Sequence, residues 1–269
     1  MPRPLTELPL AQAKEITWLL TDVDDTLTWD GTLPAETLQA LNQLKNVGIK
    51  VIAVTGACAG WCDQIAKLWP VHGVIGENGA FWMQKNETGF RTHSLIPMEQ
   101  MREQQKKLLK LLSSVLRDYP GIEFANDQPF RFCDVAINLG QDREPVNADM
   151  AARLLHSIRS LTLEGQQVHA TQSSIHINVW IGDHNKRYSS ERYLKDHTDF
   201  DRLTLNNISY IGDSLNDESM FAWLPVTFGV SNITPLLEKL GARPSYITNA
   251  NGGYGFAELA ARLVKARQR

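Results

Sequence analysis

Three aspartates within four positions, Asp22, Asp24 and Asp25, follow directly on an apolar segment at residues 16–20. Carboxylates this close repel one another, and burial at the end of a strand makes the repulsion more costly unless a cation neutralises it. The cluster therefore predicts a bound metal ion. It also marks Asp22, the first carboxylate after the apolar segment, as a candidate for chemistry.

A second acidic motif, Gly-Asp-Ser-Leu-Asn-Asp at residues 212–217, follows another apolar segment. Asp213 stands at the end of that predicted strand, and a predicted helix begins near Asp217. Carboxylates at this spacing, with Asn216 between them, suit a hard cation with oxygen ligands such as Mg²⁺. Ser214, Asn216 and Asp217 are also good helix-capping residues. Capping alone does not account for Asp213 at the end of a buried strand.

The elements that position these residues alternate between strand and helix. The hydrophobic periodicity before the middle of the chain predicts strands at 16–20, 49–54 and 73–75 and helices at 34–46 and 60–68. The same alternation later in the chain predicts strands at 208–211, 226–230 and 246–248 and helices at 186–197, 217–224, 234–240 and 255–266. This order indicates an α/β fold with a doubly wound parallel sheet. Because ligands bind at the carboxyl ends of such strands, Asp22, Thr55 and Asp213 are expected to meet at one edge.

The middle of the chain has a different pattern. It predicts helices at 99–119 and 146–161 and strands at 88–95, 130–139, 167–171 and 174–181. We therefore expect an inserted α+β cap domain at residues 85–184. The core domain is then discontinuous and consists of residues 1–84 and 185–269.

One strand of the predicted cap alternates clearly between apolar and polar side chains. The isoleucines and the valine of residues 174–181 are expected to face inward, so that His176, Asn178 and Trp180 share the other face. Two readings of that face remain open. It selects the substrate if it closes over the active site, or it is the solvent-facing side of a half-buried sheet. Arg131 and Asp134 are weaker candidates of the same kind.

Composition excludes several classes of protein. The 269 residues carry a formal net charge of −3, which gives no basic footprint for nucleic acid. No apolar run of about 18 residues is present, so neither a membrane span nor a membrane partner is expected. The first fifteen residues show no signal peptide. The three cysteines match no zinc pattern, and a cytoplasmic, reducing compartment fits them best.

The motifs together resemble a known family. Asp-Val-Asp-Asp-Thr at residues 22–26 is similar to the first motif of the haloacid dehalogenase (HAD) superfamily, and Val-Thr-Gly at 54–56 is similar to the second. Lys186 falls where the third-motif lysine belongs, and residues 212–217 resemble the fourth motif. All four occur in the family's order on the predicted elements. The position and composition of the insertion resemble the cap of subfamily IIB, which includes Cof-type and sucrose-phosphate phosphatases and phosphomannomutase.

The resemblance implies a role for each matched residue. Asp22 would be the nucleophile and Asp24 the general acid and base. Thr55, Gly56 and Lys186 would hold the oxygens of a substrate phosphate, Thr55 and Lys186 as members of the catalytic set.

The resemblance also implies a Mg²⁺ cofactor. Asp22, the backbone carbonyl of Asp24 and Asp213 would hold the ion. Asp217 would orient this shell and is itself a candidate ligand, and Asn216 is counted with the substrate-binding residues.

Some residues allow a plainer reading or depart from the family pattern. Thr55 could merely cap the next helix, and Lys186, with Arg187 beside it, could be a solvated cation. Asp25 and Arg187 stand where the family usually has glycine, and Ala57 stands where many IIB members have arginine. Asp25 adds a charge beside the expected nucleophile, and the sequence offers no reason for it.

These observations predict a Mg²⁺-dependent phosphatase. Its partner would be a small phosphorylated substrate, with a sugar phosphate or a phosphoglycerate derivative favoured, and the reaction would pass through an aspartyl-phosphate. A phosphotransferase or phosphomutase using the same intermediate is the alternative enzyme, and a non-catalytic phosphometabolite-binding regulator is the alternative of another class. The sequence does not predict the oligomeric state.

Overall fold

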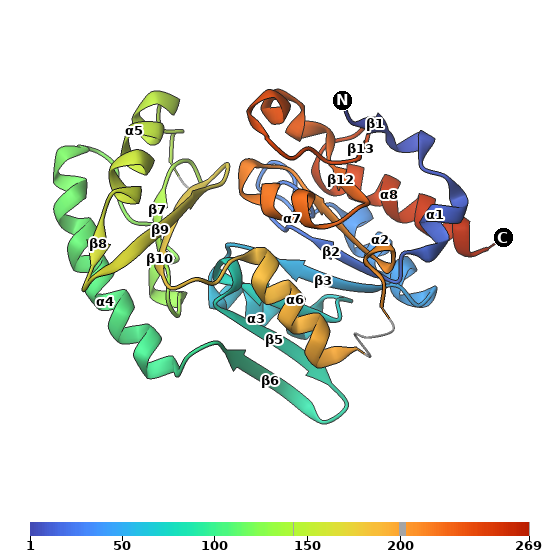
Figure 1. Cartoon of the computed structure of the whole chain (residues 1–269), viewed down its shortest axis with the longest axis horizontal. Coiled ribbons are helices and arrows are strands. Elements are labelled where there is room, and N and C mark those ends of the chain that lie inside the picture. Colours follow the sequence, from blue (N-terminus) through green and yellow to red (C-terminus); the bar gives the residue numbers. More distant parts are fainter. Residues whose placement is uncertain (142, 199–202, 269) are drawn as a thin grey trace. The chain divides into compact units, whose positions relative to one another are not determined.

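The computed structural model describes residues 1–141, 143–198 and 203–268. The chain forms two compact units. Unit 1 consists of Met1–Ala57, Trp61–His93 and Asn185–Arg269, and unit 2 consists of Cys58–Gly60 and Ser94–His184. Unit 1 thus contains both ends of the chain and unit 2 most of its middle (Figure 1).

Unit 1 is built on a nine-stranded sheet in the order β1-β13-β12-β11-β2-β3-β4-β5-β6. Its strands are β1 (Arg3–Pro4), β2 (Trp18–Thr21), β3 (Lys50–Val54), β4 (Gly73–Gly76), β5 (Phe81–Asn86), β6 (Gly89–Ser94), β11 (Ile208–Gly212), β12 (Thr227–Gly229) and β13 (Tyr246–Ile247). Neighbours from β1 to β4 are parallel, and β5 runs antiparallel to β4. The predicted α/β fold with a parallel sheet is confirmed.

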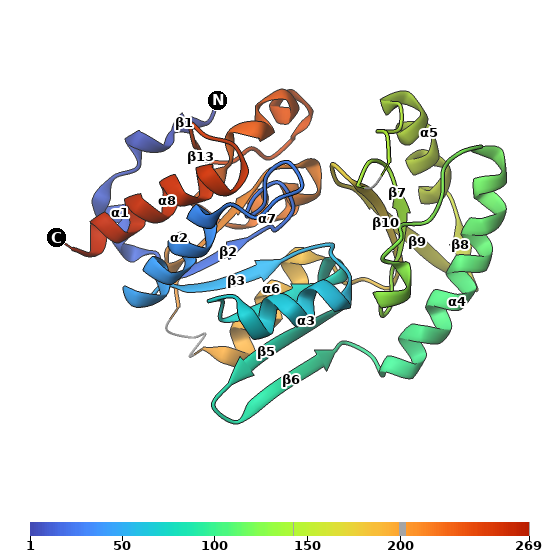
Figure 2. The same cartoon turned by 180° about the vertical axis from the view of Figure 1, so that it is seen from behind.

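Helices cover both faces of this sheet. They are α1 (Leu10–Glu15), α2 (Ala35–Asn46), α3 (Ala59–Leu68), α6 (Lys186–His197), α7 (Glu218–Trp223) and α8 (Gly252–Arg267). The two opposite views show α2 and α8 on one face and α6 and α7 on the other (Figures 1 and 2). The buried residues of α2 recur at the spacing of one helical face: Thr37, Ala40, Leu41 and Leu44. The change of face lies beside β2, where ligands bind in doubly wound sheets.

The first boundary between the units differs from the expectation. Unit 1 continues to His93 instead of ending at residue 84, because β5 and β6 form a hairpin that extends the core sheet. The sequence indicated one strand at 88–95 and placed it in the insertion. The hairpin turn at residues 87–88 leads into Gly89, the first residue of β6, whose φ of +121° is accessible to glycine. Residues 81–83 are buried, which ties β5 to the core.

Other elements also differ from the prediction. A 3₁₀ helix, Ser231–Lys239, replaces the helix expected at 234–240, and it contains Pro235, which has no N–H to donate to an α-helix. Only Val135–Asn138 of the strand expected at 130–139 is extended, because Gln128–Phe130 forms a 3₁₀ turn. Strand β1 and helix α1 were not predicted.

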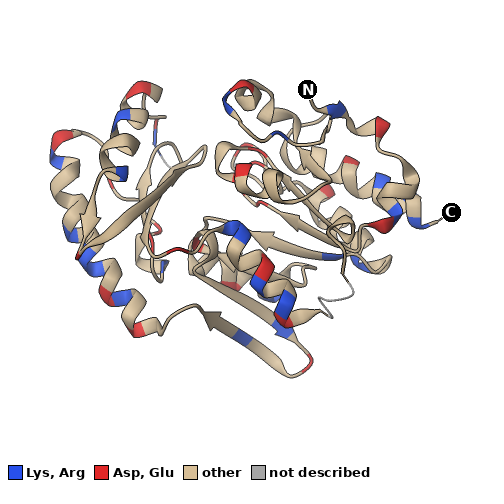
Figure 3. Ribbon diagram, in the orientation of Figure 1, with Lys and Arg blue, Asp and Glu red and all other residues tan. Residues whose placement is uncertain are grey.

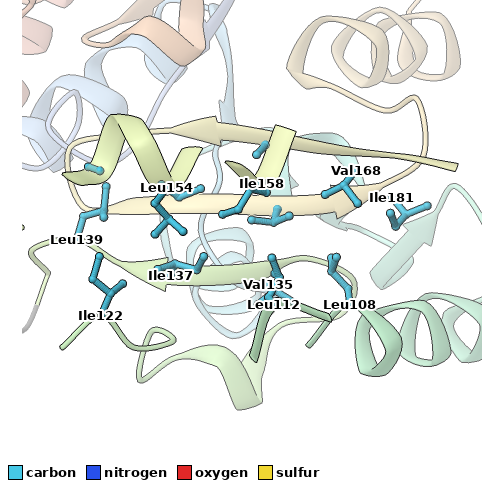
Figure 4. Packing of buried hydrophobic residues seen from close by; sticks show 14 residues of the cluster. Leu108, Leu112, Ile122, Val135, Ile137, Leu139, Leu154, Ile158, Val168 and Ile181 are labelled. Carbon is cyan, nitrogen blue, oxygen red and sulfur yellow. The ribbon is translucent and has the colours of Figure 1, made fainter. Parts of the chain in front are cut away.

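Unit 2 has a four-stranded antiparallel sheet and two helices. The sheet order is β7-β10-β9-β8. Its elements are β7 (Val135–Asn138), β8 (Thr162–Leu163), β9 (Gln166–Gln172), β10 (His176–Ile181), α4 (Met98–Val115) and α5 (Ala148–Arg159). Alternate residues of β10, namely Ile177, Val179 and Ile181, join one apolar cluster with residues of both helices (Figure 4). The predicted inward face of this strand is therefore confirmed.

The charged side chains are interspersed. Basic and acidic residues alternate along α6, whereas in α4 both signs occur in the first half and lysines alone follow in the second half (Figure 3). Among the described residues, no helix has the length and apolarity needed to cross a membrane.

A half-buried histidine, His72, joins the strands of unit 1 to helix α6. The Nδ1 atom of His72 lies 2.8 Å from the Tyr193 hydroxyl, and its ring packs edge-on against Trp18. Burial lowers the pKa of His72 from 6.5 to about 4, with Lys50 and His197 contributing in the same direction. The neutral ring therefore belongs to the folded state, whereas the unfolded chain binds a proton below about pH 6.5.

This histidine predicts acid sensitivity. Because the folded-state pKa is depressed, its stabilising contribution is present above pH 6.5 and is lost as the pH falls towards 4. The free energy of unfolding of the wild type is expected to fall about 1–2 kcal/mol further between pH 7 and pH 5 than that of His72→Phe. Urea denaturation at both pH values measures the difference. The exposed His156→Phe serves as the control, and equal losses in wild type and His72→Phe would contradict the assignment.

Candidate active site

The carboxyl ends of β2 and β11 bring two distant aspartates together. These strands are parallel neighbours, and the backbone N–H of Asp22 donates to the carbonyl of Ile211 at 3.0 Å. Asp22, Asp213 and Asp217 each offer a carboxylate oxygen, and these oxygens lie within 4.8 Å of one another. All three residues are buried.

Lys186 lies at the centre of these carboxylates. It is the first residue of α6, and its side chain is 3% exposed, so the reading as a solvated cation is wrong. Its Nζ atom donates to Asp22 Oδ1 at 2.8 Å, to Asp217 Oδ1 at 2.7 Å and to Asn216 Oδ1 at 3.3 Å. It also donates to the Tyr210 hydroxyl at 3.4 Å, so four acceptors surround an ammonium that has three protons.

Asp217 is held by hydrogen bonds at both oxygens. Oδ1 accepts from Lys186 and from the Tyr210 hydroxyl, and Oδ2 accepts from the backbone N–H groups of Asp213 and Ser214. A carboxylate has about four lone-pair sites. To bind a metal ion directly, Asp217 would have to give up one of these hydrogen bonds. Among the predicted metal ligands, Asp217 is therefore the one that the structure supports least.

Thr55 lies at the end of β3, the neighbour of β2 on its other side. It is fully buried, and its hydroxyl accepts the backbone N–H of Ala57 at 3.0 Å. This contact shapes the turn that carries Gly56 and lies ahead of α3, which begins at Ala59. Thr55 and Gly56 are thus on the sheet edge where the sequence placed them, and the phosphate-binding role of both stays a prediction.

The loop after Asp22 explains the presence of Asp25. The carbonyl of Val23 accepts the backbone N–H groups of Thr26, Leu27 and Thr28, which curls the loop tightly. Asp25 takes a φ of +55°, a left-handed conformation that glycine adopts without cost and that aspartate tolerates better than most residues. Asp24, the predicted acid and base, is half-buried in the same loop.

Burial sets the protonation of the carboxylates. It raises the pKa of Asp22 from 3.8 to about 7, although the neighbouring Lys186 ammonium opposes the change. Burial, followed by the charges of Asp22, Asp217 and Asp25, raises the pKa of Asp213 well above its usual value. Burial alone would lower the pKa of Lys186, but Asp217 and Asp22 outweigh it and raise that pKa. This oxygen-rich, strongly acidic set fits a hard divalent cation such as Mg²⁺.

Two residues near the acidic cluster were missed by the sequence analysis. Tyr210 belongs to β11 and contacts Asp217 and Lys186. Asn232 donates to the carbonyl of Asp25 at 3.0 Å and to Asp213 Oδ2 at 3.4 Å, and it accepts from the backbone of Gly252. Neither carries a motif signal, because each acts through contacts that only the folded sheet creates.

The polar face of β10 is not exposed to solvent. His176, Asn178 and Trp180 are each less than 5% exposed, so the solvent-facing alternative is wrong. Asn178 Nδ2 donates to Asp134 Oδ2 at 2.9 Å, and Trp180 Nε1 donates to the carbonyl of His184 at 3.1 Å. Both side chains thus have partners within unit 2. The substrate contacts of all three residues stay a prediction.

A buried arginine completes this polar face. Arg131 donates through Nη1 to both oxygens of Asp134, at 2.9 and 3.1 Å. Its Nε and Nη2 atoms donate to the two oxygens of Asp127, at 3.1 and 2.9 Å. Two carboxylates therefore engage all three nitrogens of this fully buried guanidinium. These contacts assign Arg131 and Asp134 to the packing of unit 2.

A family comparison agrees with the geometry of unit 1. Residues 19–117 match the family model described as haloacid dehalogenase-like hydrolase. Over these residues the chain is similar to the HAD superfamily. The resemblance to the superfamily motifs is confirmed, and the similarity supports an enzyme of the hydrolase type.

Individual relatives of this chain are distant. A phosphoglycolate phosphatase from Methanobrevibacter smithii is 21% identical over 245 residues, covering 90% of this chain and 96% of the relative. The C-terminal domain of C. albicans trehalose-6-phosphate phosphatase has a TM-score of 0.71 at 15% identity, covering 98% of both chains. A haloacid dehalogenase-like hydrolase from Bacteroides thetaiotaomicron has a TM-score of 0.64 at 14% identity, covering 92% of this chain and 99% of that one. At these identities the structural likenesses show the fold.

The raised carboxyl pKa values predict how metal binding depends on pH. Because the folded-state pKa of Asp22 is raised, the metal-free protein loses stability as the pH rises from 3.8 to about 7. A divalent cation must displace the protons, so its stabilising effect grows with pH. Saturating Mg²⁺ is expected to raise Tm by about 5 °C at pH 8 and by much less at pH 5.5, as measured by calorimetry. Asp213→Asn should abolish this response, exposed Asp30→Asn should keep it, and a pH-independent response would contradict the assignment.

The Arg131 contacts predict a large stability effect in unit 2. Arg131→Met leaves two carboxylates without their cation and is expected to cost about 3–5 kcal/mol. Urea unfolding followed by tryptophan fluorescence measures the loss. Arg153→Met, at an exposed position of α5, should change stability by about 0.5 kcal/mol or less. If Arg131→Met loses no more stability than Arg153→Met, the structural role of Arg131 is contradicted.

Proposed function

We propose that this protein is a Mg²⁺-dependent phosphatase that hydrolyses a small phosphorylated metabolite through an aspartyl-phosphate on Asp22. The observation that carries the proposal is the buried cluster in which Asp22, Asp213 and Asp217 surround the ammonium of Lys186. A nucleophilic carboxylate must approach a phosphate of the same sign, so it needs fixed positive charge beside it. Lys186, 2.8 Å from Asp22 Oδ1, supplies that charge.

The proposed reaction has two steps. Asp22 attacks phosphorus, the bond from phosphorus to the leaving oxygen breaks, and Asp24 gives that oxygen its proton. Asp24 then takes a proton from water, whose oxygen attacks phosphorus and releases inorganic phosphate and the Asp22 carboxylate. Thr55, Gly56 and Lys186 hold the oxygens on which transition-state charge accumulates. Asn216, bonded to Lys186, keeps the ammonium directed towards these oxygens.

The proposed metal set consists of Asp22, the Asp24 backbone carbonyl and Asp213, with Asp217 beside it. When bound, Mg²⁺ offsets the repulsion between these carboxylates and the substrate phosphate. Asn232 would keep Asp213 in place, since it joins Asp213 Oδ2 to the loop that carries Asp25.

The substrate class follows from relatives and not from this chain's own geometry. The relatives include a phosphoglycolate phosphatase and a trehalose-6-phosphate phosphatase, which are named for a small phosphorylated acid and a sugar phosphate. We therefore propose a phosphoglycerate derivative or a sugar phosphate as the substrate. His176, Asn178 and Trp180 are retained as candidates for choosing it. We also propose a cytoplasmic location, since the cysteine content suits a reducing compartment.

Asp22→Asn provides the direct test. The amide is a poor nucleophile, so hydrolysis of p-nitrophenyl phosphate with Mg²⁺ is expected to fall by about 10³-fold or more. Asp30→Asn is a matched control, because it lies on the surface and asparagine also tolerates its φ of +50°. Full activity in Asp22→Asn, or full activity after thorough chelation of divalent cations, would refute the mechanism.

The same assay separates hydrolysis from phosphoryl transfer. A phosphatase releases inorganic phosphate with water as the acceptor and needs no bisphosphate activator. Turnover that appears only when a second substrate is added would instead identify a phosphotransferase or mutase. A protein that binds phosphorylated metabolites without turning them over would be the non-catalytic alternative.

A further inference from the structure

Tyr210 is a buried polar residue that the proposed mechanism does not use. It lies on β11 and is fully buried, and its ring contacts Phe221 edge-on. Its hydroxyl donates to Asp217 Oδ1 and accepts from Lys186 Nζ at 3.4 Å. An apolar side chain would pack equally well in a buried strand, whereas a buried hydroxyl is costly unless it is bonded. The hydroxyl itself therefore calls for an explanation.

The backbone of β11 is shaped around this contact. Tyr210 and Gly212 are two positions apart on the strand, so they point to the same face. A Cβ atom at Gly212 would collide with Asp217 Oδ2 and would lie 2.9 Å from the Tyr210 ring. The absent side chain at Gly212 thus lets tyrosine and aspartate approach each other.

The contact completes a chain of hydrogen bonds that ends at the nucleophile. Tyr210 and Lys186 share Asp217 Oδ1, and Lys186 also donates to Asp22 Oδ1. Burial, and then the charge of Asp217, raises the pKa of Tyr210 well above its usual value, so the phenol remains a donor. With two donors on Oδ1 and two on Oδ2, the Asp217 carboxylate cannot rotate without breaking a bond.

We propose that Tyr210 is a positioning residue, whose hydroxyl fixes the Asp217 carboxylate and through it the Lys186 ammonium beside Asp22. The effect on catalysis rests on the proposed function, in which Lys186 holds the substrate phosphate. The effect on the position of Lys186 does not rest on the proposed function. Without the hydroxyl, Asp217 Oδ1 keeps Lys186 as its sole donor among the described residues, and the ammonium is drawn away from the place where it meets phosphate.

Tyr210→Phe removes this hydroxyl and keeps the ring. Tyr193→Phe is the matched control, because Tyr193 is equally buried in unit 1 but its hydroxyl bonds to His72. We expect kcat to fall about tenfold in Tyr210→Phe and the affinity for inorganic phosphate to weaken about fivefold. The affinity for Mg²⁺ should stay within twofold of the wild type, as measured by titration calorimetry. Tyr193→Phe should leave all three values unchanged.

A spectroscopic measurement tests the positioning without turnover. The buried Lys186 ammonium should give its own signal in ¹⁵N-lysine spectra, and Lys186→Arg assigns it by removing that signal. The signal should shift in Tyr210→Phe and not in Tyr193→Phe. In the double variant Tyr210→Phe/Asp217→Asn the two shifts should not add, because the hydroxyl acts on Lys186 chiefly through Asp217 and only weakly through its own 3.4 Å contact.

Each outcome decides the proposal. An unchanged lysine signal in Tyr210→Phe overturns it, and so does equal loss of phosphate and Mg²⁺ affinity together with a lowered Tm, which would mean a merely structural role. If Tyr210→Phe does not fold, the wild type is used to measure nuclear Overhauser effects between the Tyr210 ring and the Lys186 side chain. Their absence overturns the proposal. If the lysine signal shifts in Tyr210→Phe as expected but the wild type does not hydrolyse phosphate esters, the proposed function is refuted and the positioning role stands.

Discussion

The site depends on an imbalance of buried charge. Three buried carboxylates, Asp22, Asp213 and Asp217, face the single ammonium of Lys186. If all three ionise, two negative charges remain uncompensated in a region from which water is largely excluded. The molecule has two ways to relieve this, either protons on Asp22 and Asp213 or a divalent cation among them. The raised pKa values of both residues show that protons are the alternative to metal.

The sheet topology is what makes this concentration of charge possible. In the order β12-β11-β2-β3, the strands that carry Asp213, Asp22 and Thr55 are successive neighbours, although they come from opposite ends of the chain. Parallel strands end at the same edge, so one register brings all three together. Lys186 reaches them from the first turn of α6, which lies on the opposite face of the sheet from α2 and α8 (Figures 1 and 2). The charge cluster therefore forms only when helices pack stably on both faces of the sheet.

The sequence could predict the parts of the site in which a charged side chain follows a segment that is expected to be buried. Asp22 and Asp213 stand out because a carboxylate at the end of an apolar strand needs a partner, and no neighbouring residue supplies one. Tyr210 could not be recognised, because an aromatic residue in a buried strand is ordinary and its acceptor, Asp217, lies on the following turn. The alternation of β10 was interpreted correctly for its inward face. The partner of Asn178 was not foreseen, since Asp134 lies 44 positions away and comes close only when β7 and β10 pair.

Asp25 contributes to the site both through its left-handed backbone conformation and through the charge of its carboxylate. Its φ of +55° explains why glycine is usual in this position and why aspartate can replace it. A replacement chosen only for backbone shape would favour asparagine as much as aspartate, since both tolerate the left-handed region. The carboxylate adds something that asparagine would not, because its charge contributes to raising the pKa of Asp213. Asp25 therefore strengthens the demand of the acidic cluster for a cation while its backbone carbonyl, bonded to Asn232, holds the loop against the strand that carries Asp213.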